Sequence, residues 1–533
     1  MQQNDEEEYS TKEQIIESYK LIVENLKTVP KYNDFLEYDL SRGKIRTHFG
    51  GIELLHQYMR TNFSDYLNNH FSSVENLFSP ERQIEVEKDY GRYVITTAVA
   101  DSPADVGFLD SLKSYCEKND AKLVIMPCES ITNSFENKTA SFDPAFNDTS
   151  FYIVSDDEYL NENFSLCSIQ VSAKQIKSIT GLSRLGNREG SYVFASPKQF
   201  LEYVPSGNNR GKNYAIMTPG ACTKPAYYTE TFVSKRLSYI AEKDHTIGAI
   251  IVDILDEKKF DFRQVQADAD GSFIDMGTKY TSDGSTETVT ANVILGDLHG
   301  TSVDKEALEY FMDRFEHINV DNLFLHDIFD GHSISHHIKD ISERAIRAIN
   351  SNDCLKTELK LTYELIRSID TSLNPSKIHI VKSNHDEFLT RYLSAGGYVN
   401  DPKNHYMSLK IAPALFENKD VLKTAFEIAN EVNTPEYWEF HPRDSSVKIN
   451  SVECGAHGDL GMNGARPSLN SLEKIYGNCV VGHSHSAAIQ RGVFRVGTLT
   501  KLHLGYNRGP SSWTHTCCLL YDNGQRQLIN YVE

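Results

Sequence analysis

One stretch, residues 293–300 (VILGDLHG), constrains the fold of this chain more than any other. Its first four residues predict a buried strand, which ends abruptly at an aspartate and a histidine. In an extended backbone, residues i and i+2 point to the same side, so Asp297 and His299 would present a carboxylate and an imidazole to one point. The stretch therefore predicts half of a metal site at the end of a strand.

The same residue types follow three other predicted strands in the second half of the chain. These strands would cover residues 322–326 (NLFLH), 378–381 (IHIV) and 479–481 (CVV). They lead into Asp327 and Asp330, into Asn384, His385 and Asp386, and into His483 and His485, and a separate CGAHGD segment adds His457. Any one such residue is more often structural than a ligand. Their repeated position after strands argues against coincidence and predicts a metal site.

This ordered series resembles the calcineurin-like metallophosphoesterases, whose pattern is D-x-H, G-D-x-x-D, G-N-H-D/E, an isolated His and G-H-x-H. The resemblance covers about residues 291–530 and includes all five blocks in order. It has two departures, because His326 replaces the glycine before Asp327, and Gly331 replaces the arginine that often follows the second block. A milder departure places Ser383 where the third block has glycine. The resemblance implies an α/β fold with a sandwich of two sheets flanked by helices.

The family pattern implies a site for two divalent metal ions. Asp327 would bridge the ions, and the other ligands would be Asp297, His299 and His485 for the first ion and Asn384, His457 and His483 for the second. The absence of thiolate ligands argues against a structural zinc site, and the imidazoles argue against calcium. The resemblance to the nuclease branch favours manganese, with iron, zinc or magnesium as alternatives.

Further residues complete the predicted active site. In the family pattern, His385 would stand above the metal pair and stabilise or protonate the leaving oxygen. Asp330 or Asp386 would hold its imidazole, and we prefer Asp386. After His457 a glycine-rich run, GDLGMNGAR, would let backbone N–H groups approach a phosphate. Arg466 at its end could donate a fork of N–H groups, and we predict that it replaces the arginine missing after Asp330.

Such a centre predicts hydrolysis of a phosphate ester. Two divalent ions about 3.5–4 Å apart neutralise a phosphoryl group and activate a water in line with the leaving oxygen. The protein-phosphatase branch usually has D-R-G and N-H-E in the second and third blocks, whereas this chain has DGH at 330–332 and NHD at 384–386. That difference disfavours phosphoproteins as substrates.

The chain has 533 residues, which is too long for one hydrophobic core. We predict four parts, namely a helical, helix-turn-helix-like DNA-binding domain (1–65), a linker (66–89), an α/β accessory domain (90–285) and a catalytic domain (286–533).

The accessory domain would begin with a β-α-β unit, with strands at 92–100 and 122–126 and a helix at 105–119. We find no phosphate-binding loop in its sequence. The domain could present DNA, mediate assembly into a homo-oligomer, or do both.

The N-terminal segment predicts helices and one basic face. Apolar residues recur at helical spacing after a Thr11 cap, at Ile15, Tyr19, Ile22, Val23 and Leu26. Beyond Pro30, Ser41 would cap a short helix that directs Ile45 and Phe49 inward and directs outward the cations Arg42, Lys44 and Arg46. This helix resembles the helix-turn-helix-like repeats attached to phage and mobile-element endonucleases, which implies DNA binding. The alternative is a solvated basic helix in an oligomer contact.

Composition limits the partners and the compartment. The formal net charge of −20 argues against a general polyanion-coating protein, so any contact with nucleic acid would be local. No run of about 18 apolar residues occurs and the N-terminus is acidic, so we expect neither a membrane span nor a signal peptide. The cysteines show no C-x-x-C spacing, which predicts reduced thiols. We expect a cytoplasmic protein, in the host cytoplasm if it is viral.

Our first hypothesis is a two-metal DNA nuclease that cuts phosphodiester bonds with a metal-activated water. Its metal core resembles the SbcD-type repair nucleases. Its layout, with the HGDLGMNGAR stretch, resembles the large nucleases that some tailed phages make early in infection to degrade host DNA. The alternatives are a nucleotide or cyclic-nucleotide phosphodiesterase or phosphatase, and a non-catalytic DNA-binding assembly protein.

Overall fold

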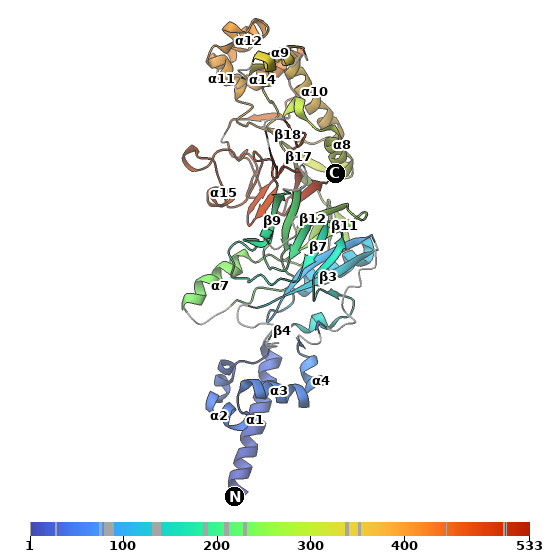
Figure 1. Ribbon diagram of the computed structural model, residues 1–533, viewed down its shortest axis with the longest axis vertical. Coiled ribbons are helices and arrows are strands. Elements are labelled where there is room, and N and C mark those ends of the chain that lie inside the picture. Colours follow the sequence, from blue (N-terminus) through green and yellow to red (C-terminus); the bar gives the residue numbers. More distant parts are fainter. Residues whose placement is uncertain are drawn as a thin grey trace.

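The structure is a computed structural model, and it describes residues 2–26, 29–73, 77–78, 90–130, 140–184, 190–206, 213–227, 232–335, 341–349, 353–443, 445–504, 507 and 509–532. The molecule is elongated (Figure 1). The N-terminal helices lie at one end, several sheets fill the middle, and helices such as α11 (Phe388–Ser394) and α12 (His405–Ile411) lie at the other end. The chain therefore has a mixed α/β fold with several sheets flanked by helices.

Four helices form the N-terminal end, namely α1 (Gln2–Leu26), α2 (Arg42–Phe49), α3 (Ile52–Asn62) and α4 (Ser64–Asn68). The buried face of α1 has the predicted spacing and consists of Ile15, Tyr19, Ile22 and Val23. Two expectations for this helix were wrong. It begins at Gln2 rather than after Thr11, because the glutamates between them favour a helix and suit its N-terminal end. Leu26, the last residue of the helix, is half exposed and does not belong to the buried face.

Helix α2 has the cap and the orientation that its sequence predicts. The Ser41 hydroxyl accepts a hydrogen bond from the backbone N–H of Lys44 at 3.3 Å. Ile45 is buried in the core of the N-terminal helices. The side chains on the other face are exposed, namely Arg42, Lys44 and Arg46. The basic face is therefore open to solvent.

A five-stranded sheet follows, in the order β12 (Phe260–Gln266), β11 (Gly248–Ile254), β2 (Arg92–Val99), β3 (Ala121–Cys128), β5 (Tyr152–Ile153). Strands β2 and β3 pair in parallel, and α6 (Val106–Asn119) connects them, which confirms the predicted β-α-β unit. The Asp105 carboxylate caps this helix by accepting from the Phe108 N–H at 3.1 Å. Another helix, α7 (Phe232–Asp244), precedes β11.

A six-stranded sheet forms the centre of the second half of the chain. Its order is β19 (Trp438–His441), β18 (Lys377–Val381), β17 (Val320–His326), β16 (Ala291–Ile294), β25 (His515–Tyr521), β26 (Arg526–Tyr531). The first four strands pair in parallel, so their carboxyl ends meet at one edge. The sheet therefore brings the polar residues that follow β16 and β17 to the same place.

Both faces of this sheet are buried, in two different cores. On one face Val293 and Leu325 pack in the core that includes the helices α8 (Lys305–Phe315), α10 (Leu355–Leu373) and α14 (Val421–Asn430). On the other face Ile294 and Phe324 pack in a core shared with the other large sheets. The alternation follows from the period of two in a strand, and it places Cys517 and Cys518 in opposite cores. Two buried faces explain why the central strands contain runs of consecutive apolar residues, such as Leu323–Leu325 in β17.

A ten-stranded sheet joins distant parts of the chain. Its order is β20 (Lys448–Ile449), β21 (Val452–Glu453), β22 (Cys479–Val481), β24 (Val493–Arg495), β23 (Ala488–Gln490), β9 (Gln199–Pro205), β10 (Asn213–Pro219), β8 (Ser191–Phe194), β7 (Phe164–Cys167), β6 (Glu158–Asn161). Strands β23 and β9 pair antiparallel, with Ala488 opposite Glu202. The segments before and after residue 286 therefore share one sheet, and the predicted domain limits stay predictions.

Short elements complete the described chain, namely β1 (Ser72–Ser73), β4 (Ser141–Phe142), β13 (Phe273–Asp275), β14 (Thr278–Tyr280), β15 (Thr286–Thr288), α9 (Ile341–Ile349), α13 (Pro413–Phe416) and α15 (Leu469–Tyr476). All nine cysteines are free thiols, as the sequence predicts. Among the helices that the structure describes, we find none with the length and apolar character that a membrane crossing requires.

Candidate metal centre

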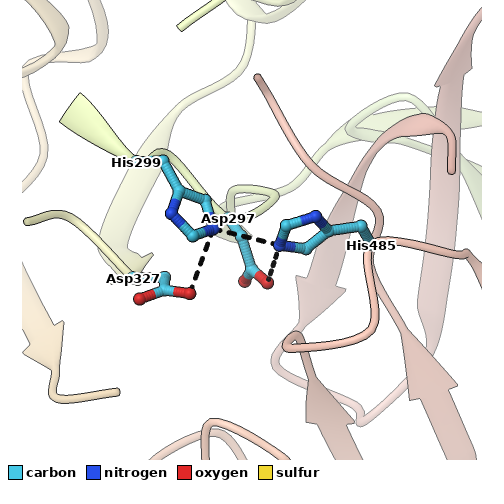
Figure 2. A group of neighbouring side chains, drawn as sticks. All are labelled: Asp297, His299, Asp327 and His485. Atoms are coloured by element: carbon cyan, nitrogen blue, oxygen red, sulfur yellow. Dashed lines mark hydrogen bonds and ion pairs between the residues drawn. The ribbon is translucent and has the colours of Figure 1, made fainter. Parts of the chain in front are cut away.

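Four of the predicted ligands converge at the carboxyl ends of strands. Asp297 and His299 follow β16 and Asp327 follows β17, while His485 follows β22 of the ten-stranded sheet. Figure 2 shows their carboxylates and imidazoles pointing toward one another. All four side chains are buried. The six-stranded sheet and the ten-stranded sheet therefore each contribute to this cluster.

The separations within the cluster suit a shared cation. The Nε2 atom of His299 lies 3.1 Å from Asp327 Oδ2 and 3.0 Å from His485 Nε2. The same His485 nitrogen lies 3.2 Å from Asp297 Oδ2. One ligand atom of each residue lies within 4.8 Å of every other. Imidazole nitrogens and carboxylate oxygens at this spacing can hold a divalent metal ion.

The backbone around the cluster adopts an unusual conformation. Left-handed φ angles occur at four predicted ligands, namely His299 (45°), Asp327 (52°), His483 (70°) and His485 (59°). For residues with a Cβ this conformation costs roughly 1–2 kcal/mol each. A left-handed conformation persists only where the surrounding structure stabilises it, and such residues are common at functional sites. The strand ends are therefore shaped to direct these side chains inward.

Gly482 lets the loop after β22 approach the cluster closely. A Cβ atom at this position would lie 2.2 Å from Asp297 Oδ1, well inside van der Waals contact. The close approach allows the backbone N–H of His483 to donate to Asp297 Oδ2 at 2.7 Å. The glycine of the H-x-H block is therefore required by contact with the first aspartate.

His457 and His483 lie beside the four-residue cluster. The His457 nitrogens lie 3.9 Å (Nδ1) from Asp297 Oδ1 and 3.7 Å (Nε2) from Asp327 Oδ2. The His457 ring centroid is 5.3 Å from that of His483. The structure thus brings both residues next to the four-residue cluster.

Several buried polar atoms of the centre make no hydrogen bond with the described residues. They are Asp297 Oδ1, Asn384 Oδ1, His485 Nδ1 and both ring nitrogens of His457. Buried polar atoms are normally paired, because leaving one unpaired costs about 1–3 kcal/mol. These carboxylate, amide and imidazole atoms offer lone pairs and few hydrogen-bond donors, so they fit divalent cations as ligands.

The electrostatics of the centre also favour a positive charge. Burial alone would lower the pKa of His299, but the carboxylates of Asp327 and Asp330 raise this pKa well above its usual value. Burial would likewise raise the pKa of Asp327, but the imidazoles of His299 and His385 hold it well below its usual value. The aspartates therefore stabilise a cation here, either a proton on His299 or a metal ion.

The two candidates for holding His385 behave differently. Asp330 Oδ1 lies 3.3 Å from His385 Nδ1 and 3.2 Å from His299 Nδ1. Both oxygens of Asp386 instead accept backbone N–H groups, from Phe329 and from Ser383, each at 2.9 Å. Both oxygens of Asp386 are therefore used by backbone N–H groups, so our preference for it is corrected in favour of Asp330.

Ser383 is a residue whose contribution the sequence analysis missed. Its hydroxyl donates to Asp327 Oδ1 and accepts the backbone N–H groups of His385 and Asp386, each at 3.0 Å. It therefore ties the third block to the central aspartate, next to the predicted ligand Asn384. The signals in the sequence were its place two residues after a buried strand and its replacement of the glycine in the third block.

The other predicted functional residues lie outside the cluster. Arg466 is exposed and lines a cavity of about 540 Å³ that also touches Ser484. The predicted DNA-binding residues on α2 lie at the opposite end of the molecule from β17 (Figure 1). They are Arg42, Lys44 and Arg46.

Comparison with known proteins gives one informative similarity. None of the protein-family models matches this chain. The chain is similar to Protein A1 of Escherichia phage T5, with 29% identity over 467 residues, which cover 83% of this chain and 82% of the phage protein. This similarity extends well beyond the metal cluster and supports a phage origin.

Proposed function

We propose that this chain is a metal-dependent phosphodiesterase that cuts DNA, with a calcineurin-like arrangement of its catalytic half. The observation that carries the proposal is the convergence of Asp297, His299, Asp327 and His485 on one buried point. Strand ends from two sheets meet there, which is the kind of edge where ligands bind in open α/β sheets.

The residues would hold two divalent ions, with Asp327 between them. Asp297, His299 and His485 would complete one site, and Asn384, His457 and His483 the other. Carboxylate, amide and imidazole ligands suit manganese, iron or zinc, and the resemblance to the nuclease branch of the family makes manganese the first choice. When bound, such ions supply charge for the phosphoryl oxygens and lower the pKa of water.

His385 is the proposed proton donor to the leaving oxygen. Burial would lower the pKa of His385, but Asp327 and Asp330 raise it above its usual value, which favours the protonated ring. The side chain is 26% exposed, so it can reach a substrate that the buried ligands cannot touch. Asp330 orients the ring through Nδ1 and leaves Nε2 to donate the proton.

Two observations favour DNA over a phosphoprotein or a free nucleotide. The sequence after Asp330 and after His385 departs from the phosphatase pattern. The chain also carries an exposed basic helix, α2, outside the segment that holds the metal cluster. The similarity to a phage protein agrees with a role in phage-driven DNA degradation.

The direct test measures hydrolysis by the full chain with manganese on five substrates. These are linear duplex DNA, circular duplex DNA, bis-p-nitrophenyl phosphate, a phosphopeptide and a free nucleotide. We expect cleavage of DNA and of the small diester, and loss of both in Asp327→Asn. Asp321→Asn is the matched control, because it makes the same change at an exposed position of the same strand. Activity on the phosphopeptide or on free nucleotides alone would contradict the proposal.

A further inference from the structure

A cavity of about 540 Å³ lies between the middle segment of the chain and the metal-bearing half. One wall comes from β9 and from the loop that holds Lys177. The other wall comes from β23, β24 and residues 509–513. The pairing of β9 with β23 joins the two walls. This size is typical of pockets that bind small molecules.

The cavity adjoins the metal centre. Ser484, which lies between the predicted ligands His483 and His485, forms part of its lining. The ring of Trp513 also lines it and packs edge to face on His485, with 4.2 Å between ring centroids. A group bound in the cavity would therefore be a neighbour of whatever the metal centre holds.

The charged residues of the lining leave an excess of positive charge. They are Lys177, Arg466, Arg495 and Glu202. The single acid, Glu202, is already paired with Lys177 at 2.6 Å. In a chain with a formal net charge of −20, a pocket with two further cations selects an anion.

Arg495 has hydrogen-bonding capacity that the described residues do not use. Its Nε donates to the Ser486 carbonyl at 2.6 Å, and within the described residues its remaining N–H groups make no hydrogen bond. Burial lowers the pKa of Arg495 to about 10, the negative charge of Glu202 opposes this shift, and the positive charge of Arg466 adds to it. Glu202 is hydrogen-bonded to Lys177 rather than to Arg495, so the fork of guanidinium N–H groups is left for a phosphate.

The rest of the lining suits a nucleobase and a sugar. Trp513, Phe200 and Tyr203 are aromatic, and Ile489 adds an apolar surface. Stacking of a base on an aromatic ring contributes affinity for any base sequence. Ser484, Ser486 and Ser512 supply hydroxyl groups at the same cavity. The lining thus combines cations for a phosphate with rings for a base.

We propose that this cavity binds the nucleotide next to the phosphodiester held at the metal centre, with Arg495 and Arg466 on a phosphate and Trp513 against a base. The inference rests on the proposed function and deepens it. It gives the middle segment a role in holding the substrate, because β9 supplies part of the pocket.

The first experiment measures nucleotide binding without catalysis. Thymidine 5′-monophosphate is titrated into the full chain in EDTA, and tryptophan fluorescence reports Trp513, one of only two tryptophans. We expect quenching that disappears in Trp513→Phe. Arg495→Gln should weaken binding roughly tenfold or more, because a charge-assisted pair to phosphate is lost. Arg495→Lys keeps the positive charge but loses the fork of N–H groups, so its affinity for the nucleotide should lie between those of the parent and Arg495→Gln. This variant replaces Arg495→Gln in the test if the glutamine variant does not fold.

The matched control is Arg491→Gln, in the turn that joins β23 to β24. Arg491 is paired with Glu473 and Asp244 and is not part of the cavity lining. This variant should bind the nucleotide as the parent does. Equal binding by the parent and both Arg495 variants would overturn the proposal.

The second experiment separates this inference from the proposed function. With manganese, Arg495→Gln should raise KM for duplex DNA about tenfold, with a much smaller effect on bis-p-nitrophenyl phosphate, which has no base or second phosphate. If the parent hydrolyses nothing but still binds the nucleotide in EDTA, the proposed function fails and the binding site stands. If DNA hydrolysis occurs with an unchanged KM in Arg495→Gln, the nucleotide pocket is wrong.

Discussion

At the scale of single residues, the centre depends on side chains that follow strands directly. Asp297, His299 and Asp327 could be predicted because a strand end leaves little freedom in where its next residues point. The choice between Asp330 and Asp386 could not, because it depends on a turn in which Asp386 accepts the N–H of Ser383. Arg495 carried no signal at all, since its sequence, VFR, reads as an ordinary strand end.

His385→Gln tests whether His385 donates a proton to the leaving oxygen rather than binding metal. The variant should lose about 100-fold or more in DNA cleavage, which is typical for the loss of a general acid. It should keep most of its manganese, because the four residues of the cluster are untouched, although His385 forms a neighbouring group of possible ligands with His299 and Asp330. Metal content after dialysis and cleavage rates measure the two effects. His317→Gln, at an exposed position, is the control, and loss of metal in His385→Gln would refute the assignment.

Gly482→Ala tests whether the close approach of the last loop to Asp297 shapes the centre. The new Cβ would meet Asp297 Oδ1 at 2.2 Å, so either the carboxylate or the loop with His483 must move. We expect manganese affinity to fall by about tenfold or more, as it does when groups that orient metal ligands are disturbed. Gly91→Ala is the control, because a Cβ there meets nothing within 4 Å. Unchanged affinity, measured by titration with manganese, would show that this contact is unimportant.

At the scale of elements, local signals predicted the short elements well. The Ser41 cap, the buried Ile45 and the exposed cations of α2 all follow from neighbours a few residues apart. The same holds for the β-α-β unit, where Asp105 caps α6. The start of α1 was predicted wrongly because residues before Thr11 have sufficient helix propensity to extend the helix to Gln2, so Thr11 does not act as its N-cap.

The exposed face of α2 leads to a prediction about DNA binding. Changing Arg42, Lys44 and Arg46 together to glutamine should weaken duplex binding and reduce the salt slope of log K by up to about three. The helix should persist, because Ile45 and the Ser41 cap are untouched. Binding at several salt concentrations measures the slope, with bis-p-nitrophenyl phosphate hydrolysis as a check on the centre.

The control changes Lys258 and Lys259 to glutamine, since both are exposed in the turn between β11 and β12. An unchanged slope in the α2 variant would leave a solvated or oligomer-facing helix as the better interpretation.

At the scale of the whole molecule, the pairing of β9 with β23 could not be predicted. The two strands lie far apart in the sequence, and nothing local in either one specifies a partner. Leu201 of β9 and Ile489 of β23 pack in the same core, but Phe200 of β9 packs in a different one, so the apolar residues of β9 do not mark a single buried face. The predicted limit between the accessory and catalytic domains therefore rests on the order of segments in the sequence alone. In the structure, the pairing of β9 with β23 places strands from both segments in one sheet.

A buried ion network also connects these parts and supports the last prediction. Asp275 accepts from Arg263 Nε at 2.5 Å, from the Tyr115 hydroxyl at 2.8 Å and from Gln527 Nε2 at 2.8 Å. These partners come from β12, α6 and β26, so one carboxylate joins the middle segment to the C-terminal strand. Burial would raise the pKa of Asp275, but Arg263 lowers it below its usual value.

Asp275→Asn should lower the free energy of unfolding by about 3–5 kcal/mol at pH 7, because it leaves the Arg263 charge buried without its main partner. Since the folded pKa of Asp275 lies below its unfolded value, its contribution is complete above about pH 4 and is lost as the pH falls further. The difference between parent and variant should therefore be constant from pH 5 to 7 and shrink below pH 4. Urea unfolding across this range measures it, with exposed Asp313→Asn as the control. A difference that grows in acid would mean that the carboxyl group is protonated in the folded protein.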